Sequence, residues 1–176
     1  VGRIKAKTYI DASNLSFEAV PLVNRHYNIN DNQAAPNGKN TVTLYFSNTD
    51  FTNYNARAEA IGKLPLTAAT NPEQDIRIIH FRSNSVTGTP ESYTASPVYI
   101  TPFSVTWLSG AATWRVMFEA EEGLGGFFLT AVKQYEFTGN GNWADAANWL
   151  NNEIPPSTLP SHYKIVIREN TVCTLD

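Results

Sequence analysis

The sequence is poor in cysteine, in charge and in long apolar runs. Its one cysteine, Cys173, excludes an internal disulfide and a thiolate metal cluster within the 176 residues. Only 16% of the residues are charged, with 13 Lys and Arg against 16 Asp and Glu and no basic cluster, so we expect no nucleic-acid partner. The apolar runs fall far short of the roughly 20 residues that cross a bilayer, so we expect no membrane span.

The histidines lack the spacing of a metal or catalytic site. His26, His80 and His162 lie in three separate strand patterns, without an HxH or HExxH arrangement. We therefore expect structural histidines and no metal site, although His26 and His80 could still meet across strands. Cys173 lies in the apolar stretch TVCTL, where a thiol is usually an inert small hydrophobe.

Acidic residues gather at one place, where Glu119, Glu121 and Glu122 precede Gly123. A glycosidase needs two carboxylates that face each other across a sugar. Consecutive carboxylates at the end of a strand are more typical of a solvated turn. Since the chain also lacks a GxSxG motif, we expect no enzyme and no catalytic residue.

Most of the chain shows the alternation of apolar and polar residues that predicts β-strands. In RIKAKTYI, residues 3–10, the pattern predicts a half-buried strand with Ile4 and Ile10 on its apolar face. Further strands are predicted at 22–29, 41–46, 75–82, 97–101 and 124–132, with a hairpin at 104–120. Such short strands favour an all-β fold, an antiparallel β-sandwich over residues 1–133, with a partly open barrel as the alternative.

One short helix is predicted at 47–60, on the edge of the sandwich. Ser47 and Asp50 have the spacing of a capping box. The residues predicted to share its apolar face are Phe51, Tyr54 and Ala58. Residues 62–74 are predicted to form a loop, and the pair Gly125 and Gly126 indicates a bulge or a close backbone approach.

Aromatic side chains raise the question of sugar binding, because carbohydrate-binding modules present exposed rings to sugar faces. Most large aromatics of a sandwich nonetheless fill its core. Tyr93 and Tyr99 flank a loop rich in Ser, Thr and Pro, so they are the candidate exposed, ligand-binding residues.

Two Asx-rich stretches, 28–33 and 140–148, carry oxygen atoms of the kind that calcium binds. Neither follows the EF-hand pattern, and Asx side chains more often cap turns by accepting hydrogen bonds from nearby backbone amides. We therefore expect no cofactor, with structural calcium as the open alternative.

Several motifs resemble, in order, an uncharacterised β-module near the C-terminus of very large secreted and cell-surface proteins of Bacteroidetes. They are VNRHYNIN, TVTLYFSNTDFTNYNA, DIRIIHFR, GTPESYT and VTWLSGAATWRVMFEAEEGLGGFFL, and they lie within residues 1–132. The chain departs in having GLGGFF, where a Ser is expected between glycines, and a shorter segment before SYT. The resemblance implies an extracellular or outer cell-surface location and export by the type IX route.

Residues 134–176 resemble the lead segment, with two spaced tryptophans, that opens β-solenoid or repeat segments in secreted bacterial proteins. There, short strands such as KIVI and TVCTL stack coil upon coil, and each coil buries its apolar face only against a neighbour. Trp143 and Trp149 would then pack across a turn at the start of a second β-module, and we expect both rings to be substantially buried.

Asn and Thr contribute 18 residues each, more together than the 29 charged residues, a bias associated with extracellular bacterial β-modules. Strand patterns begin close to Val1 and end close to Asp176, so we expect a piece of a longer polypeptide. The predicted function is a non-catalytic structural or adhesion module of a large secreted bacterial protein. Its expected partners are neighbouring modules of the same polypeptide, and glycans or cell-surface components are further candidates. The alternative is a carbohydrate-binding module attached to a secreted glycan-active enzyme.

Overall fold

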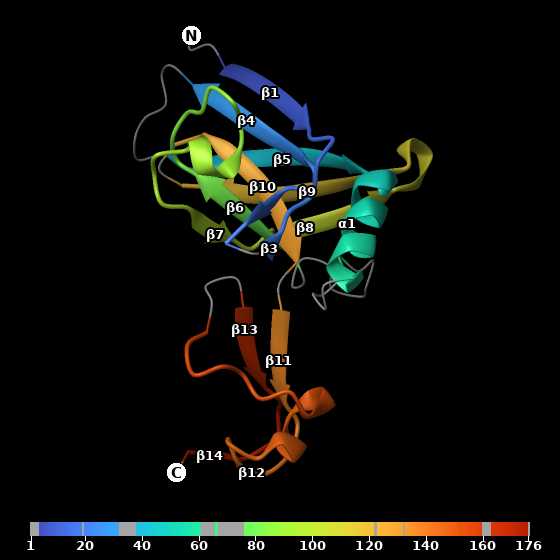
Figure 1. Cartoon of the computed structure of the whole chain (residues 1–176), viewed down its shortest axis with the longest axis vertical. Coiled ribbons are helices and arrows are strands. Elements are labelled where there is room, and N and C mark those ends of the chain that lie inside the picture. Colours follow the sequence, from blue (N-terminus) through green and yellow to red (C-terminus); the bar gives the residue numbers. More distant parts are fainter. Residues whose placement is uncertain are drawn as a thin grey trace. The chain divides into compact units, whose positions relative to one another are not determined.

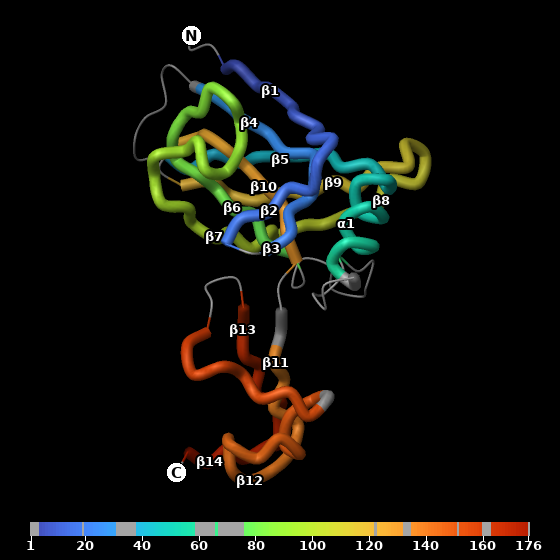
Figure 2. The backbone as a smooth tube through the Cα atoms, viewed as in Figure 1, coloured from blue at the N-terminus to red at the C-terminus, as the bar shows by residue number. Residues whose placement is uncertain are grey.

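The chain forms two units, each of which is described by itself. The computed structural model describes residues 4–18, 20–31, 38–60, 66, 76–121, 123–131, 133–159 and 163–175 (Figures 1 and 2). The first unit is Val1–Ala131 and the second is Val132–Asp176.

The first unit contains two antiparallel sheets. The larger sheet has the order β1 (Ile4–Ile10), β4 (Arg25–Asp31), β10 (Gly126–Ala131), β6 (Ile76–Phe81) and β7 (Val98–Ile100). The smaller sheet has the order β5 (Asn40–Ser47), β9 (Thr113–Ala120) and β8 (Ser104–Leu108). The remaining elements are the paired β2 (Ser16–Phe17) and β3 (Val20–Pro21), the helix α1 (Asn48–Ala60), and the 3-10 turns η1 (Pro90–Ser92) and η2 (Ser109–Ala111). The predicted antiparallel all-β sandwich with one short helix is confirmed.

The main core lies between the two sheets and α1. Along β9 the inward residues Trp114, Val116 and Phe118 are buried, while the alternate residues are more exposed. They pack with residues of β5, β6, β10 and α1 in one cluster. Because period-two alternation is what separates the two faces of a strand, the hairpin pattern read from the sequence predicts this part of the core.

The helix α1 is capped and buried as its sequence predicts. The backbone N–H of Ser47 donates to Asp50 Oδ2 at 2.7 Å, and the backbone N–H of Asp50 donates to Ser47 Oγ at 3.2 Å. The residues of its buried face are Phe51, Tyr54 and Ala58. The predicted loop at 62–74 lies outside the described residues except for buried Leu66, whose backbone is held on both sides by the Asn55 amide. No helix in the described ranges has both the length and the apolarity of a membrane-spanning segment.

The second face of the larger sheet is also covered, by a smaller core. Its buried residues are Leu15, Leu22, Ile79, Phe81, Tyr93 and Phe128. Gly125 and Gly126 make the predicted close approach, because a Cβ on Gly125 would lie 2.0 Å from the Phe81 carbonyl oxygen. A Cβ on Gly126 would lie 2.3 Å from the Tyr93 ring. The central strands β6 and β10 are therefore buried on both faces.

The prediction of a half-buried first strand is wrong, because six of the seven residues of β1 are exposed. Ile4 and Ile10 are 67% and 63% exposed, whereas Tyr9, on the other face, stacks on His26 at 4.9 Å. β1 is the outermost strand of a five-stranded sheet that faces a sheet of only three strands. Among the described residues no further strand pairs with its outer edge, and alternation alone does not predict whether such an edge strand is covered.

The second unit is built from parallel strand pairs. β11 (Lys133–Phe137) pairs with β13 (Tyr163–Ile167), and β12 (Gly141–Asn142) pairs with β14 (Cys173–Thr174). The 3-10 turns η3 (Ala146–Asn148) and η4 (Leu150–Asn152) lie between them in the sequence. Trp149 is buried with Phe137, and Trp143 is mostly buried, with its ring packed edge-on against the Trp149 ring, so the expected burial of both rings is confirmed.

Candidate functional site

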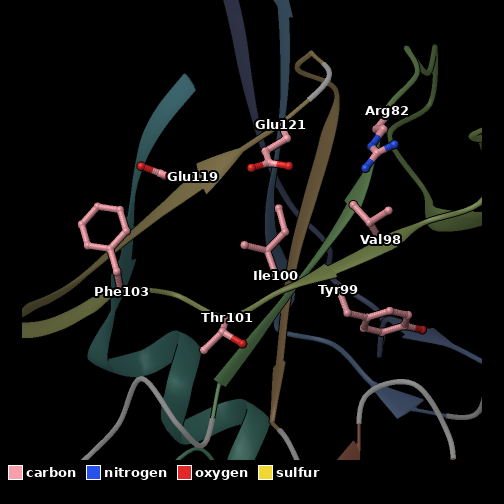
Figure 3. A pocket seen from close by; sticks show the side chains of 8 residues that line it. All are labelled: Arg82, Val98, Tyr99, Ile100, Thr101, Phe103, Glu119 and Glu121. Atoms are coloured by element: carbon pink, nitrogen blue, oxygen red, sulfur yellow. The ribbon is translucent and has the colours of Figure 1, made fainter. Parts of the chain in front are cut away.

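A pocket of about 620 Å³ opens beside β7, within the size range of ligand pockets in proteins (Figure 3). It is lined by Arg82, Val98, Tyr99, Ile100, Thr101, Phe103, Glu119 and Glu121. The lining combines an apolar wall with a charged rim, which is the arrangement that orients a small ligand.

The pocket forms where the chain passes from one sheet to the other. β7 is the outer strand of the larger sheet, and β8 begins in the smaller sheet only four residues after it. The backbone N–H of Phe103 donates to the Met117 carbonyl at 3.0 Å, and the pairing of β8 with β9 begins at Ser104 opposite Met117. Glu119 and Glu121 come after Met117 in the sequence, so they lie beyond the residues of β9 that pair with β8.

The apolar wall consists of core-facing residues at the open edge of the sandwich. Val98 pairs with His80, and Ile100 pairs with Ile78. The side chains of His80 and Ile78 point between the sheets, so those of Val98 and Ile100 do too. Val98 and Ile100 are only partly buried, because in the described part of the chain β7 is the last strand at this side of the sheet. Phe103 is 54% exposed and adds an aromatic ring to the pocket lining.

The rim holds two carboxylates and a guanidinium. Lys39 Nζ lies 2.8 Å from Glu121 and 3.4 Å from Glu119. The hydrogen bond with Lys39 lowers the pKa of the Glu121 carboxyl, and the charge of Arg82 lowers it further. The hydrogen bonds with these carboxylates raise the pKa of Lys39. The side chains of Glu119 and Glu121 are 53% and 58% exposed, and Glu122 lies outside the described residues.

The two candidate tyrosines do not share a site. Tyr99 contributes to the pocket lining, but its ring packs against the smaller core and points away from Glu121 in Figure 3. Tyr93 was expected to be exposed, and that expectation is wrong: it is 7% exposed and stacks on Phe81 at 4.9 Å. The loop that carries Tyr93 folds back over the larger sheet, and a loop composition rich in Ser, Thr and Pro does not reveal such folding.

The described histidines are separated by the larger sheet. Phe127 pairs with Tyr27 on one side and with His80 on the other, so His80 shares its face, while His26 points to the opposite face. His80 stacks on Phe127 at 4.4 Å and His26 on Phe128 at 4.7 Å. The two imidazoles therefore do not meet, and His162 lies outside the described residues.

The Asx side chains of the 140–148 stretch cap turns. Asn142 Oδ1 accepts from the Ala144 amide at 2.7 Å, and Asp145 Oδ1 accepts from the Ala147 amide at 3.0 Å. In the 28–33 stretch, the Asn28 amide donates to the Ser85 carbonyl at 3.1 Å, and residues 32 and 33 lie outside the described ranges. Among the described residues, no three His, Cys, Asp or Glu side chains gather in a way that could hold a metal ion.

Arg82 and Phe103 are the pocket residues that the sequence reasoning missed. The short TPFS stretch between two strand patterns would also suit a hairpin, so the sequence offers no signal for the change of sheet that places Phe103 in the pocket. A scan against protein-family models finds no match, and searches of curated proteins and of solved structures find none either.

Proposed function

We propose that this chain is a non-catalytic structural or adhesion module of a large secreted bacterial protein, in which the second unit begins a stack of parallel β-coils. The observation that supports this function is the double parallel pairing in the second unit. Tyr163 follows its partner Lys133 by 30 residues, and Cys173 follows Gly141 by 32. When two strands each pair in parallel with a strand that lies a similar number of residues earlier, the pattern is typical of one coil of a solenoid.

Burial within the second unit supports a further coil. Phe137 in β11 is fully buried, whereas Ile167, its partner on the same face of β13, is 51% exposed. Val172 and Leu175, next to β14, are more exposed still. A third strand in parallel register on β13 would cover this apolar edge, as neighbouring coils do in repeat proteins.

A C-terminal extension tests the stacking. We expect that a second copy of residues 145–175, placed after Leu175, raises the unfolding temperature of the second unit and protects the Ile167 amide from hydrogen exchange. The matched control carries the same extension with Ile167 of the original coil replaced by Lys, which puts a charge into the new contact. Equal protection and equal unfolding temperature with and without the extension would count against the proposal.

The proposed location is extracellular or on the outer cell surface, following export by the type IX route. The resemblance of residues 1–132 and the Asn- and Thr-rich, weakly charged composition support it. Neighbouring modules of the same polypeptide are the proposed partners, together with glycans or other cell-surface components. Digestion of the protein by a protease added to intact producing cells would support this location, and full protection until lysis would argue against it.

A carbohydrate-binding module attached to a secreted glycan-active enzyme is the second candidate. The pocket beside β7 favours it, because the exposed Phe103 ring offers stacking and the polar side chains of Glu119, Glu121 and Arg82 offer hydrogen bonding. Binding of a polysaccharide to the intact chain in solution tests this function.

A further inference from the structure

We propose that the pocket beside β7 binds a neutral saccharide, with Phe103 stacking on the sugar face and Glu121 and Arg82 bonding to its hydroxyls. The proposal rests on the second candidate function and names the ligand class of that pocket.

The balance of charge around the pocket favours a neutral ligand. Glu119 and Glu121 are matched in number by Lys39, which contacts both, and Arg82, whose charge acts on Glu121. Among the described residues, an anionic ligand would meet the two carboxylates and a cationic ligand would meet Lys39 and Arg82, so these four groups give neither sign a net attraction. Sugar hydroxyls can donate to a carboxylate and accept from a guanidinium, and so use both kinds of group.

The apolar part of the pocket suits the C–H faces of a sugar ring. A pyranose ring carries hydroxyls around its edge and C–H groups on its faces, and such faces pack on aromatic rings. Phe103 provides an exposed ring at the mouth, and Val98 and Ile100 form the wall between it and Arg82. A wholly apolar ligand would shield the charged rim from water without hydrogen bonds in return, which is unfavourable.

The other exposed aromatic side chains described in the first unit do not lie beside the charged and apolar groups that line the pocket. Tyr45 is 49% exposed, but it lies on the outward face of β5, opposite Arg115 and away from the pocket lining. Trp107 packs on Trp114 with 5.2 Å between the rings. Tyr45 therefore serves as the matched control for an exposed aromatic residue outside the pocket.

Calorimetric titration of the intact chain tests the proposal. The probes are four neutral polysaccharides, laminarin, galactomannan, xylan and starch, and one acidic polysaccharide, polygalacturonate. We expect saturable binding of at least one neutral polymer and none of polygalacturonate. Phe103→Ala and Glu121→Gln should each weaken binding about tenfold, through lost stacking and a lost charge-assisted hydrogen bond, while Tyr45→Ala leaves it within about twofold. Both pocket side chains are more than half exposed, so thermal unfolding should show that the variants remain folded.

A second readout separates a neutral from a charged ligand. Raising the salt concentration from about 0.1 M to 1 M shortens the Debye length several-fold, and the affinity for the neutral polymer should change little. If polygalacturonate is the one polymer that binds, the proposed pocket is overturned and carbohydrate binding remains. The same conclusion follows if Tyr45→Ala weakens the binding of a neutral polymer and Phe103→Ala does not. If none of the five polymers binds, both the proposed pocket and the carbohydrate-binding function are overturned.

Discussion

The indole N–H of Trp149 donates to the backbone carbonyl of Trp143 at 2.8 Å, and the two rings meet edge-to-face with centroids 4.6 Å apart. The Trp149 ring also meets Phe137 edge-on at 5.2 Å. One side chain thus joins the turn before η3 to the strand β11. Six residues are the right interval for this contact, because the chain reverses through η3 and brings Trp149 back beside Trp143.

Replacement of Trp149 by Ala should unfold the second unit selectively. Loss of a buried tryptophan costs about 3–5 kcal/mol in a well-packed site. Hydrogen exchange followed by mass spectrometry should show lost protection in β11 and β13 with protection in β10 retained. The matched control is Leu150→Ala, because Leu150 is exposed and should cost less than about 1 kcal/mol. A variant that keeps full protection in β13 would show that the tryptophan does not hold the unit together.

Gly125→Ala should destabilise the first unit by about 2–4 kcal/mol, because the added methyl group meets backbone oxygens of Phe81 and Ser83 that cannot move aside freely. Gly110→Ala is the matched control, since a Cβ there meets nothing within 4 Å. Urea unfolding monitored by circular dichroism measures both. Similar midpoints for the two variants would contradict the close approach of β10 to the end of β6.

The free energy of unfolding of the first unit should fall as the pH is lowered from the pKa of His80 in the unfolded chain to its pKa in the folded chain. Burial lowers the pKa of His80 from 6.5 to about 4, and the charge of Arg82 acts in the same direction. Between these values the unfolded chain binds a proton that the folded chain does not, so stability is lost as pH falls from about 6.5 to 4, by about 3 kcal/mol in total.

Urea unfolding at several pH values, with and without His80→Leu, isolates this contribution. The variant removes the titrating group and should flatten the pH dependence, although His26, whose pKa is also lowered by burial, still contributes. An identical pH slope in the two proteins would show that His80 is not the group responsible.

Asp50→Ala should cost about 2–4 kcal/mol, more than loss of an ordinary helix cap. Asp50 Oδ2 accepts from the Ser47 backbone at 2.7 Å and also from Arg25 Nε at 2.7 Å, and the carboxylate is nearly buried. Its removal leaves the Arg25 guanidinium without that partner. Ser47→Ala should cost only about 1 kcal/mol. Chemical denaturation of both single variants and the double variant gives the coupling energy, and strict additivity would argue against the reciprocal cap.

Local patterns predicted the elements whose neighbours are also local. The hairpin at 104–120 and the helix cap at Ser47 depend on residues close in the sequence, and both are confirmed. The loop composition around Tyr93 does not predict its burial, because its stacking partner Phe81 lies in β6, outside that loop. Phe103 was missed because only the crossing between the sheets places it at the pocket mouth.

The sequence by itself determined most strands of the two main sheets, the capped helix and the alternating core of β9. It could do so because period-two alternation and capping act over a few residues. Only the tertiary structure decided that β1 is largely exposed, that His26 and His80 are kept apart, and that a pocket opens beside β7. Those features depend on which layer covers which strand, and that is set by contacts between segments far apart in the chain.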